Sequence, residues 1–122
     1  MMKKELQNRT KKFAVEIINF SELLPNKQVG WTITNQIIRS ATSVGANYRA
    51  VCRAKSDRDF ISKMETVIEE ADETLFWLEL IEETKIINKI AELERLKKEA
   101  NELIAIFVSS VITIKKRLNQ KS

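Results

Sequence analysis

The scarcity of residues that interrupt helices is the feature that most constrains the fold of this chain. Only two glycines and one proline occur among its 122 residues. These two residue types oppose a helix interior most strongly, so the chain has few places where a long helix must end. No alternation of apolar and polar residues of useful length predicts a strand. The sequence therefore favours an all-α fold.

Apolar residues recur at steps of three and four through four segments, which is the spacing of one helical face. The first segment covers about 3–23 and the second about 30–54, with Pro25 between them. Ser56 is typical of an N-cap for a third helix that fades near Glu83 or Thr84, and Asn88 of a cap for the fourth. The expected core stripes are Leu6, Thr10, Phe13, Ile17, Phe20 and Leu24; Ile37, Ala41, Val44, Tyr48 and Val51; Phe60, Met64, Val67, Ala71, Leu75 and Leu78; and Leu93, Leu96, Ala100, Leu103, Phe107, Val111, Ile114 and Leu118.

Four long helices joined by short links predict an antiparallel up-down-up-down four-helix bundle. Residues 1–122 are long enough for a single domain. Gly45 lies inside the second helix, where glycine costs about 1 kcal/mol relative to alanine. We expect another backbone to pass close to it.

Charge is distributed in blocks along the chain. Residues 1–55 carry 10 Lys and Arg against 3 Glu, a net charge of +7, and residues 56–94 carry 4 against 12, a net charge of −8. Residues 95–122 return to 7 against 2, a net charge of +5. Antiparallel packing would bring the basic stretches to one end of the bundle and leave the opposite end acidic.

The basic end is a candidate site for nucleic-acid phosphates. The alternative is that these lysines and arginines only solubilise helix ends. The predicted nucleic-acid-binding residues are Arg49, Arg53, Lys55, Arg58, Lys115, Lys116 and Arg117. Tyr48 is the one aromatic residue expected among them, so base stacking has little support.

Two stretches, 75–81 and 104–114, are apolar almost all the way round a helix. One face of each helix can enter the core, and the apolar residues on its other faces need to be shielded from water by something else. We predict a homo-oligomer interface there; the alternative is a broad intramolecular core with Trp31 and a helix link folded over it. The predicted interface residues are Phe76, Trp77, Ile81, Ile104, Phe107 and Val108.

Few side chains in this sequence are suited to catalysis. There is no histidine, so the carboxylates of the third helix lack the Glu-x-x-His pattern of a di-iron bundle. No glycine-rich phosphate loop and no nucleophile–base pair is present. The sequence predicts a protein that is not an enzyme, with no metal and no cofactor.

The surroundings of the protein can also be predicted. The polar N-terminus lacks a signal-peptide core, and the longest uncharged apolar stretch, 103–114, is too short to span a membrane. The single Cys52 suits a reducing compartment. We expect a cytoplasmic protein without membrane contact.

Two motifs carry a resemblance to a known family. The first is Gln36-Ile37-Ile38-Arg39-Ser40-Ala41-Thr42-Ser43-Val44-Gly45-Ala46-Asn47-Tyr48. The second is Arg53-Ala54-Lys55-Ser56-Asp57-Arg58-Asp59-Phe60, followed by Glu69-Glu70-Ala71-Asp72-Glu73-Thr74 and Trp77-Leu78-Glu79-Leu80. Together they resemble the bacterial four-helix-bundle proteins encoded in intervening sequences of 23S ribosomal RNA genes. The chain also looks similar to the accessory variability protein of diversity-generating retroelements.

The resemblance implies a left-handed four-helix bundle assembled as a homopentamer, and the retroelement protein implies binding to nucleic acid. The leading hypothesis is therefore a non-enzymatic homo-oligomer that binds RNA or DNA backbones through its basic end. The rival hypothesis is a scaffold that recruits a protein partner through acidic and apolar helix surfaces.

Overall fold

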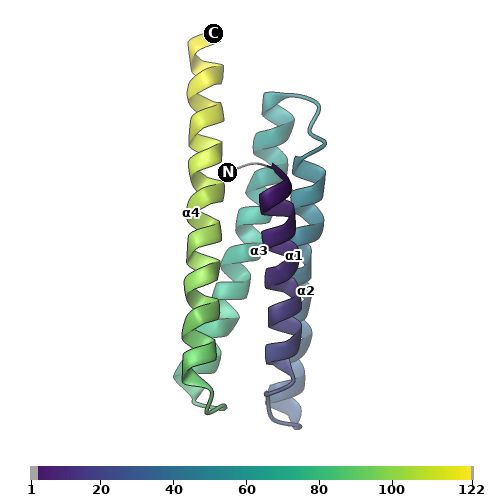
Figure 1. The fold of residues 1–122 in the computed structure, drawn as a ribbon, viewed down its shortest axis with the longest axis vertical. Helices are drawn as coiled ribbons and strands as arrows, with labels where there is room; N and C mark the ends of the chain where they lie inside the picture. The colour runs from purple at the N-terminus through teal and green to yellow at the C-terminus, as the bar shows by residue number, and fades with distance from the viewer. Residues whose placement is uncertain (1–2, 122) are drawn as a thin grey trace.

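Four antiparallel helices make up the computed structural model, which describes residues 3–121. They are α1 (Lys3–Ser21), α2 (Gln28–Val51), α3 (Asp57–Thr84) and α4 (Ile90–Lys121), and this range contains no strand. Successive helices run in opposite directions, and the chain begins and ends at the same end of the bundle (Figure 1). Each helix packs against the next one in the chain, whereas α1 and α4 touch much less. The predicted all-α up-down-up-down bundle is confirmed.

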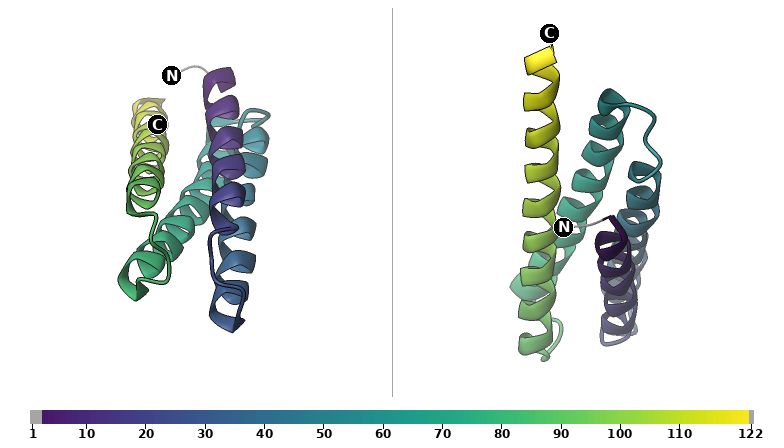
Figure 2. Two further views of the ribbon diagram at one scale, coloured as in Figure 1. Left: turned by 60° about the horizontal axis from the view of Figure 1, so that its bottom comes forward. Right: turned by 45° about the horizontal axis from the view of Figure 1, so that its top comes forward.

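The helices differ in length and tilt. α4 continues past the others at the end of the bundle that holds the termini (Figure 1). α3 runs obliquely to α1 and α2 when the bundle is tilted toward the viewer (Figure 2, left). Because α4 has 32 residues and α1 only 19, the last turns of α4 have no α1 beside them.

The helix boundaries follow local chemistry. The Ser56 hydroxyl oxygen accepts a 3.0 Å hydrogen bond from the Asp59 amide, which confirms the predicted N-cap of α3. The Asp59 carboxylate in turn accepts from the Lys55 amide at 3.0 Å. α4 begins one residue later than an Asn88 cap would require, because the Lys89 carbonyl accepts the first helical bond, from Leu93.

The two glycines serve different purposes. A Cβ atom on Gly30 would lie 1.7 Å from the Pro25 carbonyl oxygen, so the turn before α2 requires glycine there. A Cβ on Gly45 would lie 3.6 Å from the Thr10 backbone, an ordinary contact distance. The expected close backbone beside Gly45 is therefore present, and it belongs to α1.

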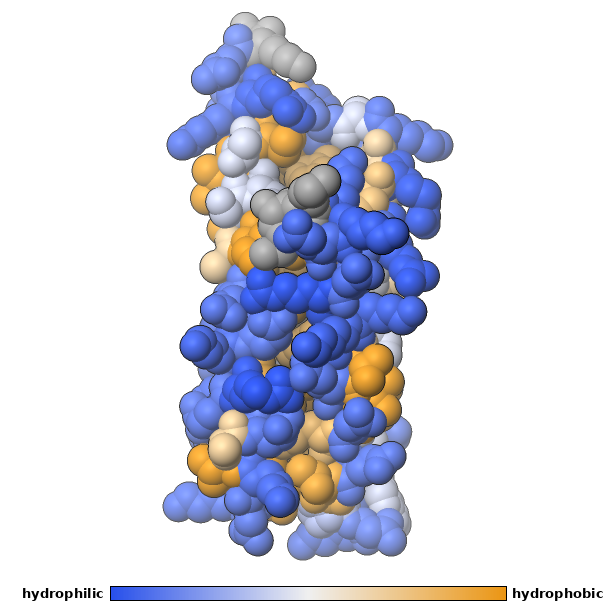
Figure 3. Space-filling view, in the orientation of Figure 1, coloured by the Kyte–Doolittle hydropathy of each residue, from blue (hydrophilic) through white to orange (hydrophobic). Residues whose placement is uncertain are grey.

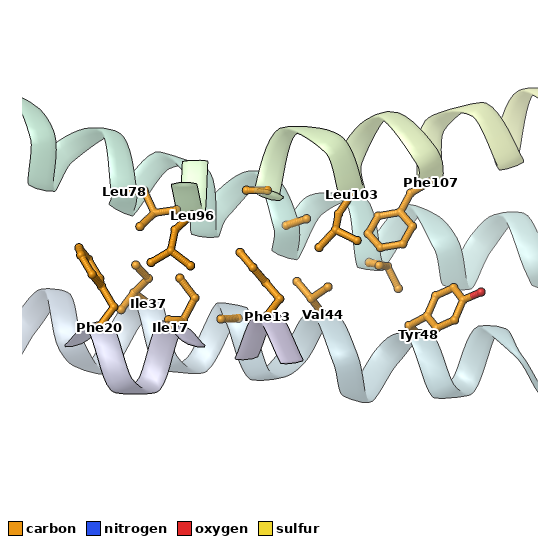
Figure 4. Close-up of a cluster of buried hydrophobic side chains, with 14 of the residues drawn as sticks. Phe13, Ile17, Phe20, Ile37, Val44, Tyr48, Leu78, Leu96, Leu103 and Phe107 are labelled. Carbon is orange, nitrogen blue, oxygen red and sulfur yellow. The ribbon is translucent and has the colours of Figure 1, made fainter. Parts of the chain in front are cut away.

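The core lies along the bundle axis and contains most of the predicted stripe residues. Figure 4 shows Phe13, Ile17 and Phe20 of α1 and Val44 of α2 facing Leu78, Leu96 and Leu103 of α3 and α4. The stripes predicted for α1 and α2 are buried throughout. This burial of apolar surface is the main source of stability in such a bundle.

The predicted stripe of α3 is partly wrong. Phe60 and Leu75 are only half-buried, and Ile61, Thr74 and Ile81 occupy core positions instead. Apolar residues surround this helix near residues 75–81, so spacing alone left its rotation uncertain by about one position.

The C-terminal part of the α4 stripe is also less buried than predicted. Ile114 and Leu118 are half-buried. Arg9 of α1 pairs with Glu99 of α4, and from there the two helices run in opposite directions until α1 begins at Lys3. Residues near the end of α4 therefore lie beyond α1 and are covered on fewer sides.

Two hydroxyl groups meet inside the core between α2 and α3. Thr74 Oγ1 lies 2.8 Å from Ser40 Oγ, and both residues are fully buried. Each also bonds to a carbonyl of its own helix, Ile37 for Ser40 and Glu70 for Thr74. Both polar groups are thus satisfied, as burial requires.

Ion pairs close the sparsely packed α1–α4 seam. The Arg9 guanidinium donates two hydrogen bonds to Glu99, at 2.7 and 2.8 Å, and a third to Glu102 at 3.2 Å. Further along, Arg95 donates to Glu16 at 2.7 Å. Two-pronged arginine–carboxylate pairs fix orientation as well as proximity, so they align α1 on α4.

A second set of ion pairs joins α2 to α3. Arg39 donates to Glu70 at 3.1 Å and forms a closer pair with Glu73. The Trp77 indole N–H also donates to Glu73, at 3.2 Å. The hydrogen bond from Arg39 is the main cause that lowers the pKa of the Glu73 carboxyl below its usual value.

The two glycines give the first prediction. Gly30→Ala should lower the free energy of unfolding by about 2 kcal/mol, because its methyl group collides with fixed backbone. Gly45→Ala should raise it by up to about 1 kcal/mol, because the methyl group fits and alanine favours the helix. Urea unfolding followed by circular dichroism measures both. Equal effects of the two substitutions would contradict this account of the α1–α2 packing.

The ion pair of Glu73 gives a prediction about pH. The Glu73 carboxyl has a lower pKa in the folded chain than in the unfolded chain. It therefore stabilises the fold at pH values above its unfolded pKa of about 4.3, and this contribution is lost as pH falls through its folded pKa. Glu73→Gln should therefore be less stable than the wild type at pH 7, with the difference shrinking toward pH ~3. Urea unfolding across this range tests the effect. Glu69→Gln, at an exposed position, is the control, and a Glu73 difference that does not change with pH would refute the assignment.

Candidate nucleic-acid interface

Basic residues gather at the end of the bundle that holds the termini. The segments 3–12, 49–59 and 115–117 lie toward that end and contain 12 Lys and Arg against 3 Asp and Glu. Segment 115–117 lies beyond segment 3–12, because α4 extends past α1 (Figure 1). The opposite end, formed by 19–30 and 79–94, contains 3 Lys and Arg against 6 Glu. The opposite end is therefore acidic, as predicted, although Lys27, Lys85 and Lys89 in the turns and helix ends reduce its net negative charge.

All seven predicted binding residues are exposed. Arg49 lies in the last turn of α2, Arg53 and Lys55 in the link to α3, and Arg58 in the first turn of α3. The other three, Lys115, Lys116 and Arg117, lie near the end of α4. Four of the seven line two separate clefts, one between α1 and α2 and one between α3 and α4, so the predicted set is not one continuous patch.

The α1/α2 cleft has a volume of about 400 Å³ and is rimmed by Lys11, Arg49 and Arg53. Its other lining residues are Gln7, Ala14, Thr42, Gly45 and Ala46. No carboxylate lines it among the described residues. A small-residue floor between cationic rims leaves room for an anionic group.

The α3/α4 cleft has a similar volume, about 400 Å³, but a different lining. Arg58 and Lys115 contribute cations, and Glu65 contributes a carboxylate. The remaining lining residues are Ile61, Ser62, Leu118 and Asn119. This cleft is closer to charge balance than the α1/α2 cleft.

The predicted cations differ in whether they are already paired. Arg117 donates to Asp57 at 2.6 and 3.1 Å, which joins the end of α4 to the start of α3 and raises the pKa of Arg117. Among described residues, Arg49, Arg53 and Lys115 form no salt bridge. Arg117 is therefore less available to a ligand than the sequence suggested.

The basic end offers no exposed aromatic ring among the described residues. Tyr48 is only 4% exposed and stacks on Phe107, with ring centroids 5.9 Å apart (Figure 4). Burial, helped by the neighbouring Cys52, raises the pKa of the Tyr48 phenol. Phe60 is half-buried, and the exposed rings of Trp31 and Phe76 lie outside the basic end. Bases therefore find no stacking platform there.

The structure corrects two of the predicted interface residues. Ile81 and Phe107 are 0% exposed within the single chain, so a neighbouring copy cannot reach them. Trp77 and Ile104 are half-buried, while Phe76 and Val108 are exposed. The core of the single chain therefore buries part of the apolar surface that the sequence assigned to an interface between copies. On the face shown in Figure 3, hydrophobic residues form separated spots within a hydrophilic surface.

Within residues 3–121, no group of three or more metal-binding side chains comes together. No helix in the described part of the chain has the length and hydrophobicity needed to span a bilayer.

Sequence reasoning missed how Lys11 joins Arg49 and Arg53. Lys11 belongs to the basic N-terminal stretch of the sequence, but its position on one rim of a cleft depends on how α1 is rotated against α2. The available signal was a four-residue spacing: Gln7 and Lys11 on α1, and Thr42 and Ala46 on α2, share one helical edge each.

Comparison with known proteins agrees with the fold. Residues 2–109 match the family described as 23S rRNA-intervening sequence protein, a range that ends before Lys115, Lys116 and Arg117. A crystal structure of a protein with unknown function from the S23 ribosomal protein family of Bacteroides thetaiotaomicron VPI-5482 is 35% identical, with a TM-score of 0.78. The match covers 86% of this chain and 96% of that chain. The search of curated proteins gave no match. Since the family match spans most of the sequence and a solved relative has the same architecture, the chain belongs to the 23S rRNA-intervening sequence protein family.

Proposed function

We propose that this protein is a non-enzymatic homo-oligomer that associates with RNA or DNA through its basic end. The observation that carries the proposal is the excess of 12 basic over 3 acidic residues in segments 3–12, 49–59 and 115–117, against a net negative charge at the opposite end. A one-sided positive field attracts polyanions and orients them before contact. The single, free Cys52 suits a reducing compartment such as the cytoplasm, where we place the protein.

The chemistry of the basic end favours phosphates over bases. Exposed arginines such as Arg49 and Arg53 can donate two parallel hydrogen bonds to one phosphate group. Without an exposed aromatic ring nearby, the site has little means of reading a base by stacking. Binding should therefore be largely independent of sequence. The solved relative is described as a member of the S23 ribosomal protein family, which makes RNA the first ligand to test.

Salt dependence provides the test of this function. Contact with four or five phosphates should give a slope of about −4 in the logarithm of affinity against that of salt. A rise from about 50 to about 200 mM salt should then weaken binding by roughly two orders of magnitude. Filter binding with RNA and DNA of unrelated sequences measures both properties. Failure to retain either nucleic acid at low salt would rule the function out.

Apolar residues on the α3/α4 side support self-association. A groove of about 300 Å³ runs between these helices, lined by Ile68, Val108, Val111 and Ile112 together with Glu65, Glu69 and Lys115. Val108 and Ile112 are 38% and 48% exposed in the single chain. A second copy would remove this apolar surface from water. The five-fold ring implied by the family resemblance is the assembly we propose.

Charge placed in this groove should disrupt the assembly. The double variant Val108→Glu and Ile112→Glu should shift the particle to smaller species, because two carboxylates would then be buried without partners. Light scattering after size-exclusion chromatography measures the mass. Leu23→Glu, which changes a similarly exposed residue in the α1–α2 turn, is the control and should leave the mass unchanged. An unaltered mass for the double variant would contradict the interface.

A protein scaffold is the second candidate, and the outer face of α3 favours it. Glu65, Glu69, Asp72, Phe76 and Glu83 are all exposed along this helix at steps of three, four and seven. An acidic stripe around an exposed phenylalanine suits a basic, apolar protein segment. Recovery of one defined protein after nuclease treatment, with no nucleic acid bound by the pure protein, would favour this function over the first.

A further inference from the structure

The cations of the basic end fall into two groups that do different work. On α1, Arg9 is held by Glu99 and Glu102 and so aligns α1 with α4. Lys11, two residues later, points to the α2 side and forms no salt bridge with a described residue. Outside the basic end, in the middle of α2, Arg39 is likewise held by Glu70 and Glu73.

The cations without salt bridges converge on the α1/α2 cleft. Lys11 stands on the α1 rim, and Arg49 and Arg53 stand on the α2 rim. Arg49 lies in the last turn of α2 and Arg53 two residues past its end, and both line the same cleft, so the two can serve neighbouring anionic groups. The cleft therefore carries three cationic groups and, among described residues, no lining carboxylate.

The floor of the cleft makes it concave. Gly45 lines it, and the backbone at Thr10 comes within contact distance of where a Cβ on Gly45 would stand. Ala14 and Ala46 continue this floor with side chains no larger than a methyl group. Small side chains allow an anion to approach between the rims, where several donors can reach it at once.

The other cleft is less suited to phosphate. Glu65 lines it beside Arg58 and Lys115, and a carboxylate repels an incoming anion. Glu65 and Lys115 also line the apolar groove to which we assigned self-association. The two sides of the bundle are thus chemically distinct.

We infer that the α1/α2 cleft is the phosphate-binding site of this protein, and that it holds successive phosphates of a phosphodiester or polyphosphate chain. This inference rests on the proposed function and narrows it to Lys11, Arg49 and Arg53. Polar Gln7 and Thr42 line the same cleft and can donate further hydrogen bonds to phosphate oxygens. The α3/α4 side then remains for contact between copies.

Matched variants with equal loss of charge test the inference. Arg49→Gln with Arg53→Gln removes two cations from the α1/α2 cleft, and Arg58→Gln with Lys115→Gln removes two from the α3/α4 cleft. Fluorescence anisotropy at low salt would follow binding of labelled RNA, labelled DNA and, by competition, inorganic polyphosphate. The first pair should weaken binding about ten-fold or more and reduce the salt slope by about 2, whereas the second should change affinity less than about three-fold.

A third variant tests the cleft without changing charge. Ala46→Leu adds bulk at an exposed helical position on the floor, so the fold should be retained and phosphate binding weakened at least about three-fold. Unfolding curves of all variants verify that they are folded. If the arginine pair proves unstable, Ala46→Leu alone decides the question.

The outcomes separate this inference from the function on which it rests. Equal losses from the two double variants, or unchanged binding by Ala46→Leu, would overturn the cleft while leaving nucleic-acid association intact. A wild-type protein that binds none of the three polyanions would overturn both. Binding of polyphosphate but of neither nucleic acid would keep the cleft and reject the nucleic-acid function.

Discussion

Burial of four apolar stripes against one another is the interaction on which the rest of this structure depends. The stripes of α1 and α2 enter the core completely, from Leu6 to Leu24 and from Ile37 to Val51. Most large apolar side chains lie along this one axis, so the charged and polar features lie on the outside of the bundle. Their positions follow from how each helix packs against the core. Rotation of each helix about its own stripe decides which polar side chains meet.

That rotation explains how far the sequence could predict the molecule. Spacing of apolar residues was enough for four helices, their order and most of the core, and the chemistry of Ser56 was enough for one boundary. It failed at Leu75, where apolar residues surround α3 and Thr74 reaches the core through its bond to Ser40. Steps of three and four from Met64 through Val67 and Ala71 lead to Thr74, but the neighbouring Leu75 is apolar and was assigned to the core in its place.

The sequence was enough to predict where the candidate site lies, but not which of its charged side chains come together. The sequence indicated which helix ends meet, and the structure bears this out in the dense basic end. Which cations are neutralised depends on partners distant in sequence: Arg117 meets Asp57, and Arg9 meets Glu99. These meetings depend on the axial offset and the rotation of whole helices, which no local pattern records. For the same reason the sequence led us to assign Phe107 to the interface between copies, although Phe107 stacks on Tyr48 inside the bundle.

The hydroxyl pair between α2 and α3 has a consequence for alignment. Ser40 and Thr74 face each other in the buried part of the seam, among apolar side chains of the core. Sliding α3 by one turn would set each hydroxyl against an alkyl group and forfeit their mutual bond, so one axial register is preferred over its neighbours. Purely aliphatic seams lack such a marker, because shifted registers bury nearly the same area. Two small side chains at mid-height thus help determine how far each helix projects at the distant, positively charged tip.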